Sequence, residues 1–197
     1  MKIQFCCFIL LLLSLSACSL QPPKNTGIDQ AEKVAVQARP LKMTQALPKG
    51  MPDINLESAI YEVPVNDGVS YQDVVDSLKS VSEGMNFVNP ANFPIGDHMK
   101  ARGIDPQGVK EVHALCNLTM GTDIMLDHPE FLVFAPCRIA LYEKPDANKK
   151  LHLFLGLDRP TFDLKSIKNP TERAQKSAQQ LEDALILLMS KARKGEI

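Results

Sequence analysis

The stretch TERAQKSAQQLEDALILLMSKARK, residues 171–194, carries one apolar stripe at helical spacing and constrains the fold more than any other part of this sequence. Asn169 is placed to cap the helix, Pro170 suits its first position, and Glu172 completes a capping box. The stripe consists of Leu181, Ala184, Leu185, Leu188 and Ala192. Such a helix buries its apolar face against another layer, so the rest of the chain has to supply that layer.

Extended segments precede this helix. A β-like run, SAIYEVPV, opens the folded part, and VKEVHALCN, residues 109–117, alternates as a strand. EFLVFAPCRIALYEK, PDAN and KKLHLFLGL then read as strand, turn and strand, with the leucines at 151, 153, 155 and 157 on one face. In 109–117, we expect Val112, Ala114 and Cys116 to face the core and Glu111, His113 and Leu115 to face away.

Two further helices are expected between these strands. Ser70 and Asp73 form a capping box before an apolar period that ends at Gly84, and LTMGTDIMLD ends before Pro129. A shorter helical segment is expected around Ile95 to Arg102. Strands flanked by helices predict an α+β domain, an antiparallel-rich curved sheet with helices packed on one face.

The N-terminus is typical of exported proteins. Lys2 and the apolar run FCCFILLLLSL form a signal peptide, and LSAC, residues 15–18, resembles the lipobox of bacterial lipoproteins. We therefore expect a signal peptide at 1–17, acyl chains such as palmitate on Cys18, a tether over 18–57 and one domain over 58–197. Ser19, where Asp often marks inner-membrane lipoproteins, favours a periplasm-facing anchor in the outer membrane over the inner membrane.

Composition excludes one class of partner. The chain has 22 Lys and Arg against 23 Asp and Glu, so it has no basic field for nucleic acid. No CxxC, CxxCH, Gly-x-Ser-x-Gly or phosphate-binding glycine loop is present, and no cofactor is expected.

Cys116 and Cys137 are the cysteines that remain if the signal is removed and Cys18 is lipidated. If their strands are parallel neighbours, the two thiols lie at similar heights and can meet. If the second strand begins after Pro136, the cysteines lie at opposite ends and a disulfide is excluded.

Four interpretations of this pair stay open: a structural disulfide, buried free thiols, a redox pair, or a metal or cofactor site. A redox pair would need a lowered thiol pKa, for which Arg138 and the helix start after Cys116 offer causes. A metal site is disfavoured because the histidines lack compact ligand spacing; these are His98, His113, His128 and His152. On a strand, His113 and Cys116 point to opposite faces, and a half-exposed His113 on the outer face is expected.

Two polar neighbours of the cysteines are candidates for a ligand groove, Asn117 and Arg138. Arg138 alternates with Tyr142 on the face opposite Ile139 and Leu141, a face that is either solvated or the wall of a groove. A solvated face is favoured.

The helix YQDVVDSLKSVSEGMNFV, the CN at 116–117, the segment PCRIALYEK at 136–144 and the strand KLHLFLGL together resemble the domain of unknown function 302 family. The resemblance covers about Tyr61 to Asp163, is expected to include the last helix, and implies a compact α+β domain similar in shape to the TATA-binding-protein-like fold. It implies no activity. The family's cysteine positions match Cys116 and Cys137, while Leu118 stands where relatives often have Pro.

From these observations we expect a lipid-anchored periplasmic binding module for a small molecule or an envelope protein, without catalysis of its own. An apolar groove between the sheet and a long helix is the expected site. A thiol-dependent redox protein using Cys116 and Cys137 and a structural envelope scaffold remain as alternatives.

Overall fold

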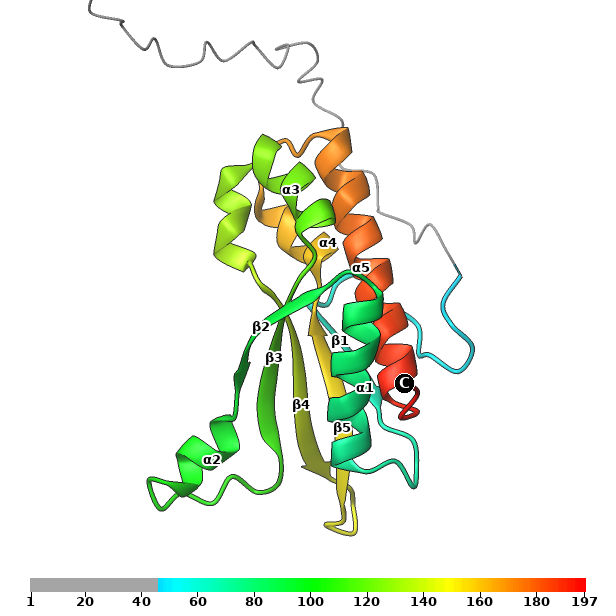
Figure 1. The fold of residues 1–197 in the computed structure, drawn as a ribbon, viewed down its shortest axis with the longest axis vertical. Helices are drawn as coiled ribbons and strands as arrows, with labels where there is room; N and C mark the ends of the chain where they lie inside the picture. The colour runs from blue at the N-terminus through cyan, green and yellow to red at the C-terminus, as the bar shows by residue number, and fades with distance from the viewer. Residues whose placement is uncertain (1–45) are drawn as a thin grey trace, which may run out of the picture. The chain divides into compact units, whose positions relative to one another are not determined.

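The computed structural model describes residues 46–197. Its five strands are β1 (Ile60–Pro64), β2 (Val88–Phe93), β3 (Lys110–Cys116), β4 (Cys137–Pro145) and β5 (Leu151–Asp158). They form a sheet of order β1-β5-β4-β3-β2 in which every neighbouring pair is antiparallel (Figure 1). The expected α+β class with an antiparallel sheet is confirmed. Within residues 46–197, no helix has the length and apolar character needed to cross a bilayer.

Three longer helices pack on one face of the sheet, α1 (Tyr71–Gly84), α3 (Leu118–Asp127) and α5 (Glu172–Ala192). The predicted capping box of α1 is present, because Ser70 accepts from the Asp73 amide while the Asp73 carboxylate accepts from the Ser70 amide. The short helices are α2 (Ile95–Lys100) and α4 (Pro160–Asp163), with 3-10 turns η1 (Pro129–Phe134) and η2 (Leu164–Ser166).

The start of α5 differs from the expectation. Thr171, not Asn169, is the N-cap, and its hydroxyl accepts from the Ala174 amide at 3.1 Å. Asn169 has φ +54°, a left-handed conformation that belongs to the turn before the helix. The predicted cap was therefore two residues too early, since two good cap residues lie close together there.

The strand predicted from Glu130 was also too long. Residues 129–134 form η1, and β4 begins only at Cys137. Pro129 opens this turn and Phe131 turns into the core with 5% of its surface exposed, whereas Leu132 and Val133 point outward. Periodicity alone does not distinguish a strand from a helix in a short apolar run between prolines. Here the run forms a short 3-10 helix.

The predicted faces of β3 were inverted. Leu115 pairs with Cys137 and His113 with Ile139, and these residues face the helices, while Ala114 and Arg138 share the opposite face. Cys116 therefore follows the core-facing Leu115 instead of pointing into the core itself. Strand β3 carries apolar residues on both faces, Leu115 on one and Val112, Ala114 and Cys116 on the other, so its alternation does not decide the orientation.

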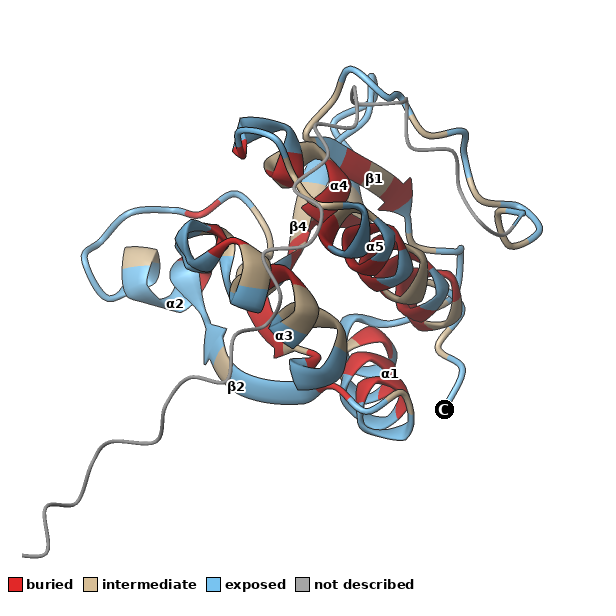
Figure 2. Ribbon diagram, turned by 90° about the horizontal axis from the view of Figure 1, so that it is seen from above, coloured by how far each residue is buried: buried red, intermediate tan, exposed pale blue. Residues whose placement is uncertain are grey.

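The core lies between the sheet and the helices. Tyr61, Leu157 and Ile139 form one row across β1, β5 and β4, and each is at most 3% exposed. Helix α5 packs over this apolar part and against α1, α3 and α4. Figure 2 shows the difference in cover, because α5 is buried along one side whereas β2 is exposed almost throughout.

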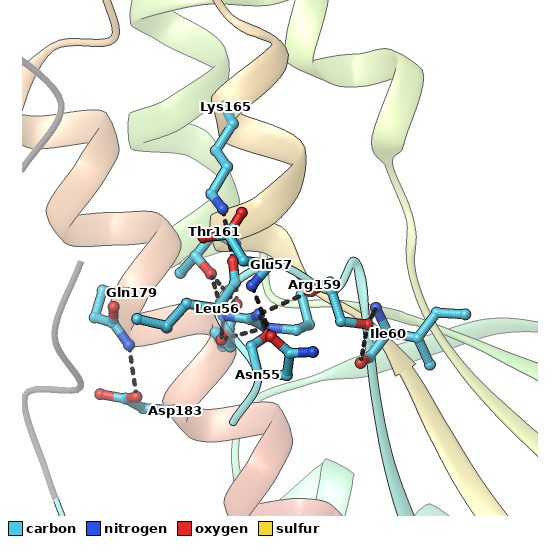
Figure 3. A network of polar contacts seen from close by, with 11 residues as sticks. Asn55, Leu56, Glu57, Ile60, Arg159, Thr161, Lys165, Gln179 and Asp183 are labelled. Atoms are coloured by element: carbon cyan, nitrogen blue, oxygen red, sulfur yellow. Dashed lines mark hydrogen bonds and ion pairs between the residues drawn. The ribbon is translucent and has the colours of Figure 1, made fainter. Parts of the chain in front are cut away.

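Residues 46–57 contain no helix or strand, yet they contact the domain. Leu47, Met51 and Ile54 pack against the core, so the packed part begins before the predicted boundary at 58. Arg159, 3% exposed, donates to the carbonyl oxygens of Asn55 and Ser58, both at 2.8 Å. Figure 3 shows Arg159 beside Asn55 and Thr161. The Arg159 guanidinium also pairs with Glu182 of α5 at 2.9 Å.

The same Glu182 carboxylate accepts from the backbone amide of Thr161 at 3.0 Å and from its hydroxyl. One buried ion pair thus joins the entry segment, the end of β5, the start of α4 and the middle of α5. Every charged oxygen of Glu182 has a donor, which offsets part of the cost of burying it.

On the opposite face of the sheet, Tyr142 stacks with Phe154 at 6.3 Å between ring centroids. Its hydroxyl donates to Glu62, which also pairs with Lys144 at 2.6 Å. The ring lies over Gly156, where a Cβ would come within 2.9 Å of the Tyr142 oxygen.

Replacing Glu182 by Ala should lower the free energy of unfolding by about 3–5 kcal/mol, because it leaves the Arg159 guanidinium buried without its counter-charge. Urea denaturation measures the change, with Gln180→Ala, an exposed position on the same helix, as the control expected within about 0.5 kcal/mol of wild type. The double change Arg159→Met with Glu182→Leu should recover part of the loss. An equal loss in Gln180→Ala would refute the assignment.

Candidate functional site

The row of side chains under the helices changes character at β3. From Tyr61, Leu157 and Ile139 it continues to His113 of β3 and Asn92 of β2. The next row ends in Glu111, which lies opposite Leu141. The covered face is therefore apolar under α5 and polar where the sheet extends past α1.

A groove of about 480 Å³ lies at this polar end. We call it the α1–β2 groove. One wall is formed by Val75, Lys79 and Glu83, which follow one another at intervals of one turn along α1. The other wall is formed by β2 and by Phe87 just before it. It is lined by Val75, Lys79, Glu83, Phe87, Val88, Asn89, Ala91, Asn92 and His113. Its volume falls within the range of small-molecule sites, and its walls combine apolar surface with a few polar groups.

His113 lies at the floor of this groove. The side chain is 1% exposed, and its Nε2 lies 3.2 Å from Glu111 Oε1 without hydrogen-bond geometry. Among residues 46–197, that buried nitrogen has no hydrogen-bond partner. Burial lowers the pKa of His113 from its ordinary 6.5, and the Glu111 charge opposes the shift in part. The imidazole is therefore neutral near pH 7 and has an unused hydrogen-bonding atom.

Tyr71 of α1 reaches across to β3 and donates to the second oxygen of Glu111. Burial, and then the hydrogen bond to Glu111, raise the pKa of Tyr71 to about 12. A second cavity of about 200 Å³ lies beside this contact, between α2 and the start of β3. Its polar lining includes Asp97 and Lys100, which pair at 3.2 Å. Tyr71, Glu111 and His113 thus form one polar chain along the floor of the sheet.

Sequence reasoning missed this chain. A half-exposed His113 on the outer face was expected, and that expectation is wrong because the faces of β3 are inverted. Glu111, His113 and Leu115 lie on one face of β3, and of these three Leu115 belongs to the apolar core. Leu115 is therefore the signal in the sequence that could have identified the buried face.

The two cysteines lie at the other end of β3, at a separate small pocket, which we call the thiol pocket. Its volume is about 30 Å³, room for one or two water molecules. The lining is mainly apolar and also holds two carboxylates, Asp158 and Asp163; the remaining residues are Leu115, Cys116, Asn117, Gly121, Met125, Phe131, Phe134, Ala135, Cys137, Pro160 and Leu181. Both thiols are free.

Neither predicted register of the cysteine strands is the observed one. Strands β3 and β4 are antiparallel, so the parallel arrangement does not occur. Strand β4 does begin after Pro136, but its first residue lies opposite Leu115, so the cysteines are at the same end of the strand pair. Among residues 46–197, no three His, Cys, Asp or Glu side chains are grouped to hold a metal ion.

The thiol of Cys137 is not activated. Burial raises its pKa to about 12, with the nearby Cys116, Asp163 and Asp158 acting in the same direction and Arg138 opposing them. A thiol with this pKa is almost entirely protonated near neutral pH. Arg138 therefore does not produce the lowered pKa that a nucleophilic Cys137 would need.

The other candidate residues have structural partners. Asn117 is the N-cap of α3 and accepts from the Met120 amide at 3.1 Å. Arg138 shares the open face of the sheet with Tyr142, as expected, and pairs with Asp158. Asn117 lines the thiol pocket, and neither residue lines the α1–β2 groove. Cys18 lies outside the described residues.

Asp163 is the most perturbed carboxyl near the thiols. Burial, followed by the charge of Asp158, raises its pKa from 3.8 to about 7, while Arg138 lowers it in part. As pH rises from about 4 to 7, the unfolded chain releases this proton while the folded chain retains it. The protein therefore loses stability across this window because of Asp163.

Asp163→Asn should raise the free energy of unfolding by about 1–2 kcal/mol at pH 8, a range reduced for the partial exposure of the side chain. At about pH 4 the gain should shrink toward zero, because Asp163 is then protonated in the folded chain and partly protonated in the unfolded chain. Denaturant unfolding at both pH values measures this, with the exposed Asp97→Asn as control. A gain of equal size at both pH values would contradict the assignment.

Comparisons with known proteins place the fold in a family. The domain of unknown function DUF302 matches residues 61–188. An uncharacterized protein of Aquifex aeolicus (strain VF5) is 29% identical over 92 residues, which are 47% of this chain and 57% of that protein. The matched part thus spans little more than half of the relative.

Among solved structures, the crystal structure of an uncharacterized conserved DUF302 protein from Bacillus stearothermophilus has a similar fold. It shares 16% identity with a TM-score of 0.57, covering 68% of this chain and 97% of that one. The family match extends over more than half of the sequence and includes the α1–β2 groove and both cysteines. The chain belongs to the family of the domain of unknown function DUF302.

Proposed function

We propose that this chain is a lipid-anchored envelope protein whose domain binds a small molecule in the α1–β2 groove. The observation that carries the proposal is His113, a buried imidazole with an unpartnered nitrogen at the floor of a groove of about 480 Å³. An unsatisfied buried polar atom costs about 1–3 kcal/mol. A ligand that bonds to it would recover that cost.

The lining suggests the chemistry of the ligand. Val75 and Phe87 offer apolar surface, while Asn89 and Asn92 offer amides that can donate and accept. Lys79 and Glu83 contribute one charge of each sign, so the walls do not select strongly for a charged molecule. A compact apolar body with one neutral donor–acceptor group fits this lining.

The anchor rests on the N-terminal sequence. The apolar run and LSAC at 15–18 support lipidation of Cys18, and two or more acyl chains anchor a protein stably. Ser19 supports the outer membrane, with the domain facing the periplasm. The membrane, through the lipid, and the groove ligand are the partners that we propose.

Three probes that share one ring test the groove: benzamide, benzoate and benzylamine, added to the isotope-labelled full chain in detergent micelles and followed by NMR. We expect benzamide to bind best, with a Kd in the millimolar range typical of fragments, and to shift the His113 ring signals. Asn92→Trp, which places a large ring in the groove, should abolish binding.

Asn148→Trp is the matched control, because Asn148 is also exposed but lies in the turn between β4 and β5. It should bind benzamide as wild type does. Equal binding by the Asn92→Trp variant, or no binding of any of the three probes at about 10 mM, would refute the groove as the site.

Cys18→Ser should release the chain from the membrane fraction and prevent incorporation of labelled palmitate, because no acyl chain can then be attached. Ser19→Asp is the companion variant, expected to retain the lipid and to move the protein from the outer to the inner membrane. Fractionation by density gradient measures both. Palmitate labelling of Cys18→Ser at the wild-type level would contradict lipidation at this residue.

A further inference from the structure

The chain leaves the sheet and returns to it between the two cysteines. Cys116 is the last residue of β3 and Cys137 is the first residue of β4. Everything between them, α3 and η1, is an excursion of the chain above one end of the sheet (Figure 1). The two cysteines are therefore the neck of this excursion.

The backbone at the neck meets the distance limit for a disulfide. Leu115 lies opposite Cys137 in the antiparallel pair, so Cys116 is one residue further along. Opposed residues are about 4.5–5.5 Å apart and one step along a strand adds about 3.4 Å, which gives a diagonal Cα separation of about 6 Å. Disulfides span Cα separations up to about 7 Å.

The side chains also share one space. Both cysteines line the thiol pocket, whose volume is about 30 Å³. The neighbouring Cys116 contributes, after burial, to the raised pKa of Cys137. In regular strands the two side chains would point to opposite faces. Cys116 is the last residue of β3, where the strand gives way to the turn into α3, and there it lines the same pocket as Cys137.

We propose that Cys116 and Cys137 form a reversible disulfide that closes the neck of the α3–η1 excursion. This inference is independent of the α1–β2 groove. The bond would link residues 116 and 137 and so join the two ends of the excursion. It would stabilise the folded state by restricting the conformations of the unfolded chain.

The oxidant is a low-molecular-weight or protein disulfide. The first attack falls to Cys116, because Cys137 retains its proton: the Cys116 sulfur bonds to one sulfur of the oxidant and expels the other as a thiol. Cys137 then gives up its proton, which the thiolate expelled in this second step takes up. Its sulfur attacks the Cys116 sulfur and expels the second thiol. Two electrons pass to the oxidant, which leaves as two thiols.

Oxidised glutathione tests this on the purified full chain in detergent, followed by rapid alkylation and peptide mapping, which separates these cysteines from those near the N-terminus. We expect a peptide pair cross-linked between Cys116 and Cys137, reversed by dithiothreitol, and a rise of about 5 °C in the unfolding midpoint on oxidation. Cys116→Ser and Cys137→Ser should each lose the cross-link and the rise.

Three outcomes would overturn the proposal. They are separate glutathione adducts on the two cysteines, a cross-link between chains, or an internal cross-link that lowers the unfolding midpoint and so belongs to a distorted fold. Benzamide binding measured on the same samples keeps the two proposals distinguishable, because binding does not depend on the state of the thiols.

Discussion

The buried pair of Arg159 and Glu182 is the contact on which the arrangement of this domain depends. It lies where β5 ends, and the guanidinium also holds the carbonyl oxygens of Asn55 and Ser58. Residues before the first strand are thereby fixed to the last helix. Helix α5 crosses the apolar part of the sheet in the position that this pair sets, and α1 and α3 pack on α5. Burying two opposite charges contributes little net stability, so we infer that the main effect of this ion pair is to fix one arrangement of the elements.

Because α5 is fixed over β1, β5 and β4, the other end of the sheet keeps less cover. The side-chain rows turn from leucine and isoleucine to Glu111, His113 and Asn92 at that boundary. A polar floor beside an apolar core is costly unless something bonds to it, and Tyr71 satisfies only one oxygen of Glu111. The groove and its unpartnered imidazole are thus a result of where the helices stop.

Much of the fold was predictable because local signals agree with the tertiary structure. The capping box at Ser70 and Asp73, the turn before Leu151 and the stripe of α5 each specify one element without ambiguity. The failures fall where two local solutions are nearly equal. Asn169 and Thr171 compete as caps, residues 130–134 suit strand or short helix, and β3 has apolar residues on both faces. The last of these errors also led to the wrong placement of His113 in the candidate site. Its position depends on which face of β3 is buried, and only packing decides that.

The open face of the sheet has a consequence for which residues positions 142 and 156 can hold. The ring of Tyr142 rests on Gly156, with no room for a Cβ between them. A mutation at 156 would lift the ring from Phe154 and from Glu62, whereas loss of the ring would free position 156 to vary. The two positions therefore constrain each other in this chain, because a side chain at 156 and the present placement of the aromatic ring at 142 exclude each other.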